Sequence, residues 1–136
     1  MRVLNYPVLM VHGMGFRDHN YLNYWGRIPS KLEGAGCRVF YGNQDSNAAI
    51  ETNAKVLADR IKELLAKTGA PKLNVIAHSK GGLDIRCAIA KYGLGDKIAS
   101  VTTMSTPHNG SVTVDKLLKL PDPLVRFAGK CTDIVF

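Results

Sequence analysis

Residues 74–86 read NVIAHSKGGLDIR, a stretch that passes from apolar residues to a single serine and then to a helical pattern. Residues 72–77 have the length and composition of a buried strand, and residues 80–92 are patterned as a helix that ends at Gly93. Ser79 is therefore predicted to lie on the turn between a strand and a helix.

The residues on both sides of Ser79 are small. Ala77 and Gly81 stand two positions before and after it, which gives the nucleophile-elbow pattern with alanine in place of the first glycine. A turn this sharp puts the serine in a sparsely populated backbone conformation, and small neighbours relieve the crowding. A serine beside glycines at a strand end can also be an ordinary loop residue, so the pattern requires support from its context.

The length and composition fit one domain that spans residues 1–136. Hydrophobic residues make up 46% and charged residues 21%, as in soluble globular proteins, and no apolar run approaches the roughly 20 residues of a membrane span. The opening MRVLNYPVLMVHG lacks a small-residue cleavage site, so we predict no signal peptide. A cytoplasmic location is the expectation, and secretion is left open.

The charge and the cysteines point to no special partner. The formal net charge is +7, but the 18 lysines and arginines are spread from Arg2 to Lys130 with acidic residues between them. Nucleic-acid binding needs basic residues concentrated on one face or helix, so no nucleic-acid partner is predicted. Cys37, Cys87 and Cys131 lack CxxC spacing and are predicted to be free thiols. We expect neither a cofactor nor a metal ion.

Strand-like and helix-like segments alternate along the chain. The predicted strands are residues 7–11, 38–41, 72–77 and 98–104, and the predicted helices are residues 24–34, 53–68 and 80–92. This alternation predicts an α/β fold with a parallel sheet flanked by helices. Functional sites in such sheets lie at the carboxyl ends of the strands, where His12-Gly13 and His78-Ser79 both fall.

A serine that cleaves an ester also needs donors for the negative oxygen of the tetrahedral intermediate. Each backbone donor is worth about 2.7 to 4 kcal/mol. The amide of Lys80 follows the serine and opens a helix, whose dipole favours an anion. The segment HGMG, residues 12–15, is placed to supply the second donor, and we assign it to Met14.

Three segments of the chain resemble bacterial triacylglycerol lipases of the α/β-hydrolase superfamily. They are YPVLMVHGMG (6–15), LLAKTGAPKLNVIAHSKGGLDIR (64–86) and VTTMSTPHNGS (101–111), in the family's order and approximate spacing. The resemblance implies Ser79 as the nucleophile and the Met14 and Lys80 amides as oxyanion donors, with His12 and His78 shaping the two loops. Residues 106–108 are similar to a family segment that usually serves as a loop scaffold.

The superfamily places an acid and then a histidine after the serine in chain order. The only histidine after Ser79 is His108. Asp96 precedes the predicted strand at residues 98–104, and a strand rises about 3.3 Å per residue, so Asp96 should lie roughly 20 Å from the catalytic edge of the sheet. Asp84 lies on the helix after the serine, where we expect structural contacts. We therefore predict an N-terminal part of a longer α/β-hydrolase domain, its sheet truncated after about four strands and its catalytic acid and base missing. The alternatives are His108 or Lys80 as the base.

The predicted function is a serine ester hydrolase, a lipase or carboxylesterase, that forms an acyl-enzyme on Ser79 with apolar carboxylic esters. One alternative is a non-catalytic relative that binds acyl ligands. Another is a nucleotide-binding module, against which the incomplete phosphate motif in HGMGFRD argues. In similar lipases the region that corresponds to residues 112–130 begins the lid over the acyl pocket, which suggests a lipid or other apolar ester as the substrate. The resemblance also implies transient contact with a lipid interface. The other interpretation of that segment is an ordinary helix packed on the sheet.

Overall fold

The computed structural model describes residues 6–15, 24–112 and 116. The chain divides into two compact units, residues 1–106 and residues 107–136, and the helices and strands named below belong to the first. In the second unit, the Gly110 amide donates to the Pro107 carbonyl at 3.0 Å and closes a short turn. Apart from Val112 and Lys116, the segment that resembles a lid lies outside the described residues, as does Cys131.

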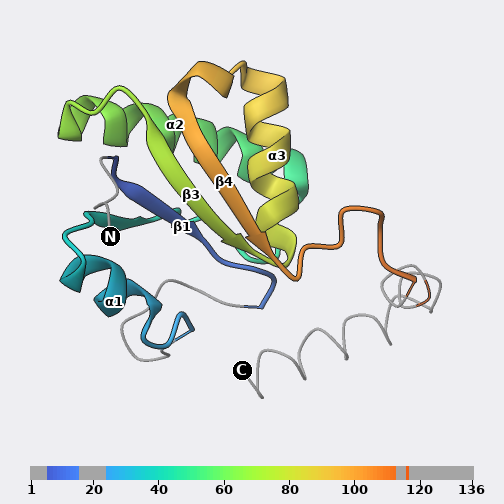
Figure 1. Ribbon diagram of the computed structural model, residues 1–136. Coiled ribbons are helices and arrows are strands. Elements are labelled where there is room, and N and C mark those ends of the chain that lie inside the picture. Colours follow the sequence, from blue (N-terminus) through green and yellow to red (C-terminus); the bar gives the residue numbers. More distant parts are fainter. Residues whose placement is uncertain (1–5, 16–23, 113–115, 117–136) are drawn as a thin grey trace. The chain divides into compact units, whose positions relative to one another are not determined.

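The described part of the chain contains one sheet of four parallel strands (Figure 1). The strands are β1 (Val8–Val11), β2 (Val39–Tyr41), β3 (Leu73–His78) and β4 (Ile98–Met104). They lie in the order β2-β1-β3-β4, so β1 and β3 are central. The predicted α/β architecture is confirmed, and the carboxyl ends of the four strands meet at one edge of the sheet.

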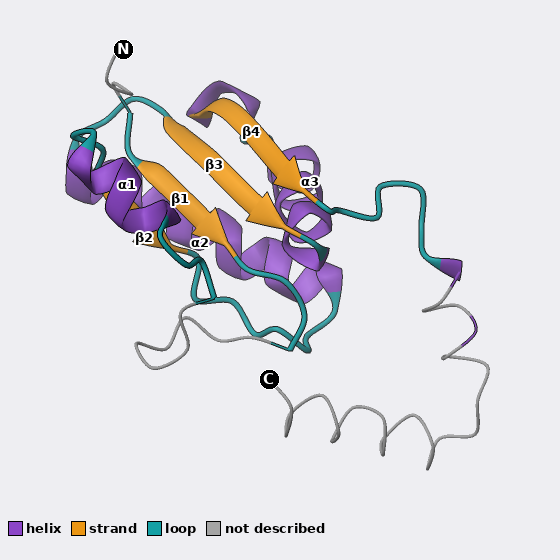
Figure 2. Cartoon of the chain, turned by 60° about the horizontal axis from the view of Figure 1, so that its bottom comes forward, coloured by secondary structure: helices purple, strands orange, loops and turns teal. Residues whose placement is uncertain are grey.

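Among the described residues, three helices connect these strands. They are α1 (Ile28–Gly34), α2 (Ile50–Thr68) and α3 (Lys80–Tyr92), and a short 3-10 turn (Gly95–Lys97) precedes β4. Helices α2 and α3 cover one face of the sheet, and α1 covers the other (Figure 2). Within the described residues, none of the helices has the length and hydropathy to cross a membrane.

Strand β1 is buried on both faces and divides the core in two. Leu9 and Val11 pack with the apolar face of α2 and α3, while Val8 and Met10 pack with Trp25 on the α1 side. Successive side chains of a strand point to opposite faces, so four consecutive apolar residues supply both cores. This burial fixes β1 at the centre of the sheet and, with it, the position of the loop that follows.

Two helix boundaries differ from the predicted ones. Helix α1 begins at Ile28 rather than at Tyr24 because Pro29, which lacks an amide hydrogen, occupies its first turn. The Ile28 amide donates to the Trp25 carbonyl at 3.1 Å, so the preceding residues form a turn. Helix α2 begins at Ile50, three residues earlier than predicted. The first difference places Tyr24 outside the helix, where its hydroxyl reaches the strand ends.

Strand β4 is the outer strand of the described sheet. Ala99, Ser100, Val101 and Thr102 are all exposed, and Val101 retains 39% of its accessible surface. In parallel sheets both faces are normally covered, so an exposed run in the middle of a strand is uncommon. Within the described residues, β4 therefore presents an open edge.

Neighbouring positions of α2 offer a test of this packing. Leu57 is fully buried, whereas Val56 is 41% exposed. We expect Leu57→Ala to lower the free energy of unfolding by about 2–5 kcal/mol because it leaves a cavity. Val56→Ala should change it by less than about 0.5 kcal/mol. Urea denaturation measures both variants, and equal losses would contradict the assigned face of α2.

Candidate active site

Ser79 lies between the last residue of β3 and the first residue of α3, as predicted. Its backbone has φ 51° and ψ −128°, a region that residues other than glycine rarely occupy. Two hydrogen bonds hold it there: the Ser79 amide donates to the Met104 carbonyl at 2.8 Å, and the Gly82 amide donates to the Ser79 carbonyl at 3.1 Å. The turn is therefore fixed both by the neighbouring strand β4 and by the first turn of α3.

Gly81 and Gly82, which follow Ser79, pack closely against the end of β1 and the segment after β4. A Cβ atom on Gly81 would lie 2.7 Å from the Val11 carbonyl oxygen, and one on Gly82 would lie 2.8 Å from the Thr106 Cβ. Both distances are shorter than real Cβ contacts, so only glycine fits at these positions. The small residues of the motif are thus required because the start of α3 is wedged between β1 and the segment after β4.

The loop after β1 lies directly against Ser79. A Cβ atom on Gly13 would lie 2.9 Å from the Ser79 Cβ, and the Gly13 amide donates to the Tyr24 hydroxyl at 3.1 Å. Met14 comes next, on an exposed turn. The structure therefore brings together the two segments that carry the predicted oxyanion donors, Met14 beside Gly13 and Lys80 beside Ser79.

His12 is a buried part of the scaffold beneath this loop. Its Nδ1 lies 2.8 Å from the Gly13 carbonyl oxygen, and because a carbonyl can only accept, Nδ1 carries the proton. The His12 carbonyl in turn accepts a hydrogen bond from Gln44 Nε2 at 2.9 Å. The residue is 1% exposed, which agrees with the expectation that His12 shapes the loop.

The side chain of Lys80 points to Asp84 one turn along α3. Its Nζ lies 2.9 and 3.0 Å from the two carboxylate oxygens, and Asn53 Nδ2 donates to Asp84 at 2.9 Å and to the Asp45 carbonyl at 2.7 Å. Burial raises the pKa of Asp84, and the hydrogen bonds from Lys80 and Asn53 oppose that shift. An ammonium group engaged in this way is poorly placed to act as the base, which argues against that role for Lys80. Asp84 makes structural contacts, as expected.

Tyr24 connects the two loops at the site. Its hydroxyl accepts the Gly13 amide and also hydrogen-bonds to His78 Nδ1. Its ring stands edge-on to the His78 ring, with centroids 5.4 Å apart. His78 is thus held by a contact that reaches across the site, in keeping with its expected role in shaping the loop.

Asp96 and His108 were the other candidates for the acid and the base. Asp96 is in the 3-10 turn before β4, at the opposite end of that strand from Met104. His108 is exposed and belongs to the second unit, so its role as a base stays a prediction. Within the described residues, no three side chains of His, Cys, Asp or Glu gather in a way that could hold a metal ion.

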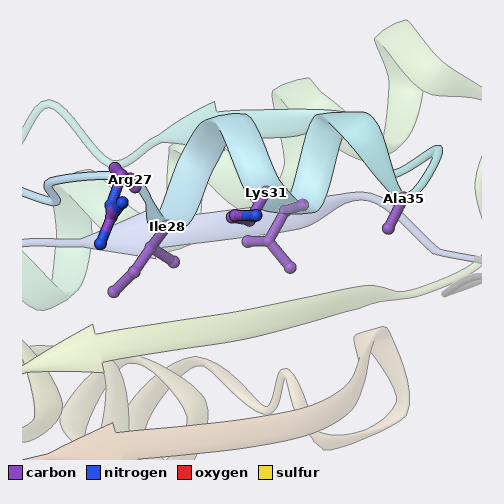
Figure 3. Close-up of a pocket in the computed structure, with 5 residues that line it drawn as sticks. Arg27, Ile28, Lys31 and Ala35 are labelled. Atoms are coloured by element: carbon purple, nitrogen blue, oxygen red, sulfur yellow. The ribbon is translucent and has the colours of Figure 1, made fainter.

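An open hollow of about 620 Å³ lies alongside helix α1 (Figure 3). Its lining comes from α1 and the turns at its two ends, namely Arg27, Ile28, Lys31, Leu32 and Ala35. None of these residues belongs to the group around Ser79. The hollow is therefore not the candidate active site.

Sequence reasoning missed Tyr24 and Asn53. Tyr24 has partners 11 and 54 positions away and Asn53 has one 31 positions away, and no local pattern reports contacts of such range. The pair of Lys80 and Asp84 did leave a signal, because opposite charges four residues apart on a helix commonly pair.

The fold and the site together define an α/β protein with a strained serine at the end of a central strand, opening a helix. Residues 6–125 match the family of the α/β-hydrolase fold. The chain therefore belongs to the α/β-hydrolase family.

Known proteins resemble the chain over most of its length. It is 39% identical over 115 residues to triacylglycerol lipases of Pseudarthrobacter phenanthrenivorans and Burkholderia plantarii, which covers 81% of this chain and 35% and 32% of those proteins. A crystal structure of a mature Bacillus licheniformis lipase superposes with a TM-score of 0.76 at 22% identity, covering 83% of this chain and 45% of that one. This likeness shows the fold, and the two relatives confirm the resemblance to triacylglycerol lipases. The chain spans about a third of the length of these curated relatives.

Glycine at position 81 can be tested against a glycine with free space. Gly81→Ala should lower the free energy of unfolding by about 1–3 kcal/mol, because the new Cβ collides with backbone carbonyls. At Gly34, the last residue of α1, a Cβ would meet open space, because no other part of the described residues comes within 4 Å of it. Gly34→Ala should therefore be neutral or stabilising by up to about 1 kcal/mol. Thermal or urea denaturation compares the two, and a neutral Gly81→Ala would contradict the close approach.

The raised pKa of Asp84 predicts a pH dependence of stability. Between the ordinary value of 3.8 and the raised value, the folded chain binds more protons than the unfolded chain, so Asp84 makes the free energy of unfolding fall as pH rises. The stability of the wild type relative to Asp84→Asn should therefore decrease as pH rises from 3.8 through this window.

Asp59→Asn is the matched control, because the hydrogen bond from Lys55 lowers the pKa of Asp59 and gives the opposite slope. Urea denaturation of the three proteins in a pH series measures both slopes. If the wild type instead became more stable relative to Asp84→Asn as pH rises, the hydrogen bonds from Lys80 and Asn53 would lower the pKa of Asp84 by more than burial raises it.

Proposed function

We propose that the chain carries the nucleophile and the oxyanion-binding loops of a serine ester hydrolase, a lipase or carboxylesterase that acts on apolar carboxylic esters. The observation that carries the proposal is the strained Ser79 at the start of α3 with Gly13 packed against it. We assign the donors on either side of the Ser79 hydroxyl to the amides of Met14 and Lys80, which follow Gly13 and Ser79.

The proposed reaction begins with attack of Ser79 Oγ on the ester carbonyl carbon. The carbonyl oxygen becomes an oxyanion, and the amides of Met14 and Lys80 donate hydrogen bonds to it. The base takes the Ser79 proton during the attack and gives it to the leaving oxygen when the intermediate collapses, which releases the alcohol and leaves an acyl-enzyme on Ser79. Water, deprotonated by the same base, then attacks the acyl carbon, and the proton returns to Ser79 as the free acid leaves.

The backbone explains why Lys80 suits the role of donor. The first four amides of a helix lack acceptors within the helix, and Lys80 is the first residue of α3. The helix dipole adds a partial positive charge at the same point. Because the donor is a backbone group, the Lys80 side chain can pair with Asp84 without affecting the chemistry.

Two considerations support a base and an acid from elsewhere in the protein. In α/β-hydrolases the acid and the histidine follow the serine in chain order. Within the first unit, the described histidines are His12 and His78, and both precede Ser79 and contact loop residues. The matched part of this chain covers 35% and 32% of the two similar lipases, so those lipases contain further residues that this chain does not match.

The substrate class rests on the relatives and on the surface at the site. The relatives are named triacylglycerol lipases. The side chain of Met14 is apolar and 53% exposed, and it stands on the residue whose amide is a proposed oxyanion donor. An ester with an apolar acyl chain fits both facts. We propose that the protein meets such substrates by transient contact with a lipid interface.

A fluorophosphonate probe tests the nucleophile in the protein that carries this chain. The wild type should take up the label at Ser79, located by peptide mass spectrometry, and Ser79→Ala should lose the label and reduce kcat for a short-chain ester by about 10⁶-fold. Ser105→Ala is the matched control, since Ser105 is exposed, follows β4 and also has a positive φ of 50°. A wild type that takes up no label would favour a non-catalytic relative that binds acyl ligands.

A further inference from the structure

Tyr24 is held firmly next to the site by its ring. The ring packs edge-on against Trp25, with centroids 5.0 Å apart, and against His78 at 5.4 Å. Trp25 itself is 7% exposed and belongs to the core under α1. The tyrosine is therefore anchored from one side and reaches the strand ends with its hydroxyl.

That hydroxyl has a partner in each of the two loops at the site. It accepts the Gly13 amide at 3.1 Å and hydrogen-bonds to His78 Nδ1. A tyrosine hydroxyl has one proton and two lone pairs, so it can accept from Gly13 while it donates to an unprotonated Nδ1. One oxygen atom thus joins the residue before Met14 to the residue before Ser79.

The backbone of Gly13 has little space around it, so the residues that the bridge joins are closely packed. A Cβ on Gly13 would lie 2.9 Å from Ser79 Cβ, 3.2 Å from the Tyr24 hydroxyl and 3.3 Å from the His78 carbonyl oxygen. The loop after β1 therefore sits as close to the serine turn as a bare backbone allows. Its hydrogen bond to Tyr24 is what orients the Gly13 peptide within that space.

We infer that Tyr24 is a positioning residue, which sets the separation of the two oxyanion donors by fixing the Gly13 backbone against the turn at Ser79. The inference rests on the proposed function, because the donors matter only if an oxyanion forms. It differs from a purely structural role, which would stabilise the fold without favouring the transition state over bound substrate.

The test compares Tyr24→Phe with Tyr92→Phe, a tyrosine that is also half-buried but lies at the far end of α3. Tyr24→Phe keeps the ring and removes the bridging oxygen. Amide hydrogen exchange at Gly13, followed by NMR, should become at least about 10-fold faster in Tyr24→Phe and stay unchanged in Tyr92→Phe. This readout needs no catalysis, so it decides the bridge even if the wild type takes up no phosphonate label.

The catalytic part is read from a trifluoromethyl ketone, which mimics the tetrahedral intermediate. Tyr24→Phe should lower kcat and the affinity for this inhibitor by about 10-fold, with KM nearly unchanged, because misplacing a donor costs less than removing one. Equal weakening of KM and inhibitor affinity, or Gly13 exchange identical to that of Tyr92→Phe, would overturn the inference. An inert wild type would instead overturn the proposed function.

Should Tyr24→Phe fail to fold, His78→Phe removes the other end of the bridge and keeps a ring in place. The Gly13 amide should then exchange faster than in the wild type, because the Tyr24 hydroxyl loses its hydrogen bond to His78. Unchanged Gly13 exchange in a folded His78→Phe protein would also overturn the inference.

Discussion

The hydrogen bond from the Ser79 amide to the Met104 carbonyl is the constraint on which the site depends. Without it, β3 could run on into α3 through a relaxed turn, since the observed conformation costs about 1–3 kcal/mol. The bond exists because β4 pairs with β3 as far as His78 and Met104, one residue short of the serine. The position of Ser79, the proposed nucleophile, is thus set by the register of two parallel strands.

The order of the strands supplies the rest of the site. Because β3 lies between β1 and β4, the turn at Ser79 has a neighbour on each side: the carbonyls at the end of β1 meet Gly81, and Thr106 after β4 meets Gly82. Positive φ values occur outside glycine at Asn43, Ser79 and Ser105 among the described residues, each just after a strand. Backbone strain is therefore concentrated at the carboxyl edge of the sheet, where α/β proteins place their sites.

The parts of this arrangement that the sequence predicted are those encoded by neighbours in the chain. Strand and helix alternation follows from hydrophobic periodicity, and the serine turn follows from small residues within two positions of Ser79. The start of α1 was misplaced because the apolar pattern before Pro29 continues into a turn. Tyr24 and Asn53 escaped prediction because their partners come from other strands and helices, and a partner is identified only once the sheet order is known.

The backbone and the side chain of Lys80 face different surroundings. Its amide opens helix α3 directly after Ser79, whereas its ammonium turns back to Asp84, a residue that is 1% exposed. A buried ion pair of this kind adds little net stability, because desolvation offsets attraction, but removing one partner leaves a costly unpaired charge. The amide would serve with many side chains at position 80, so the chemistry of the site does not by itself require lysine there. What constrains the position is Asp84, which joins α3 through Asn53 to the start of α2 and so ties the helix that begins after Ser79 to its neighbour.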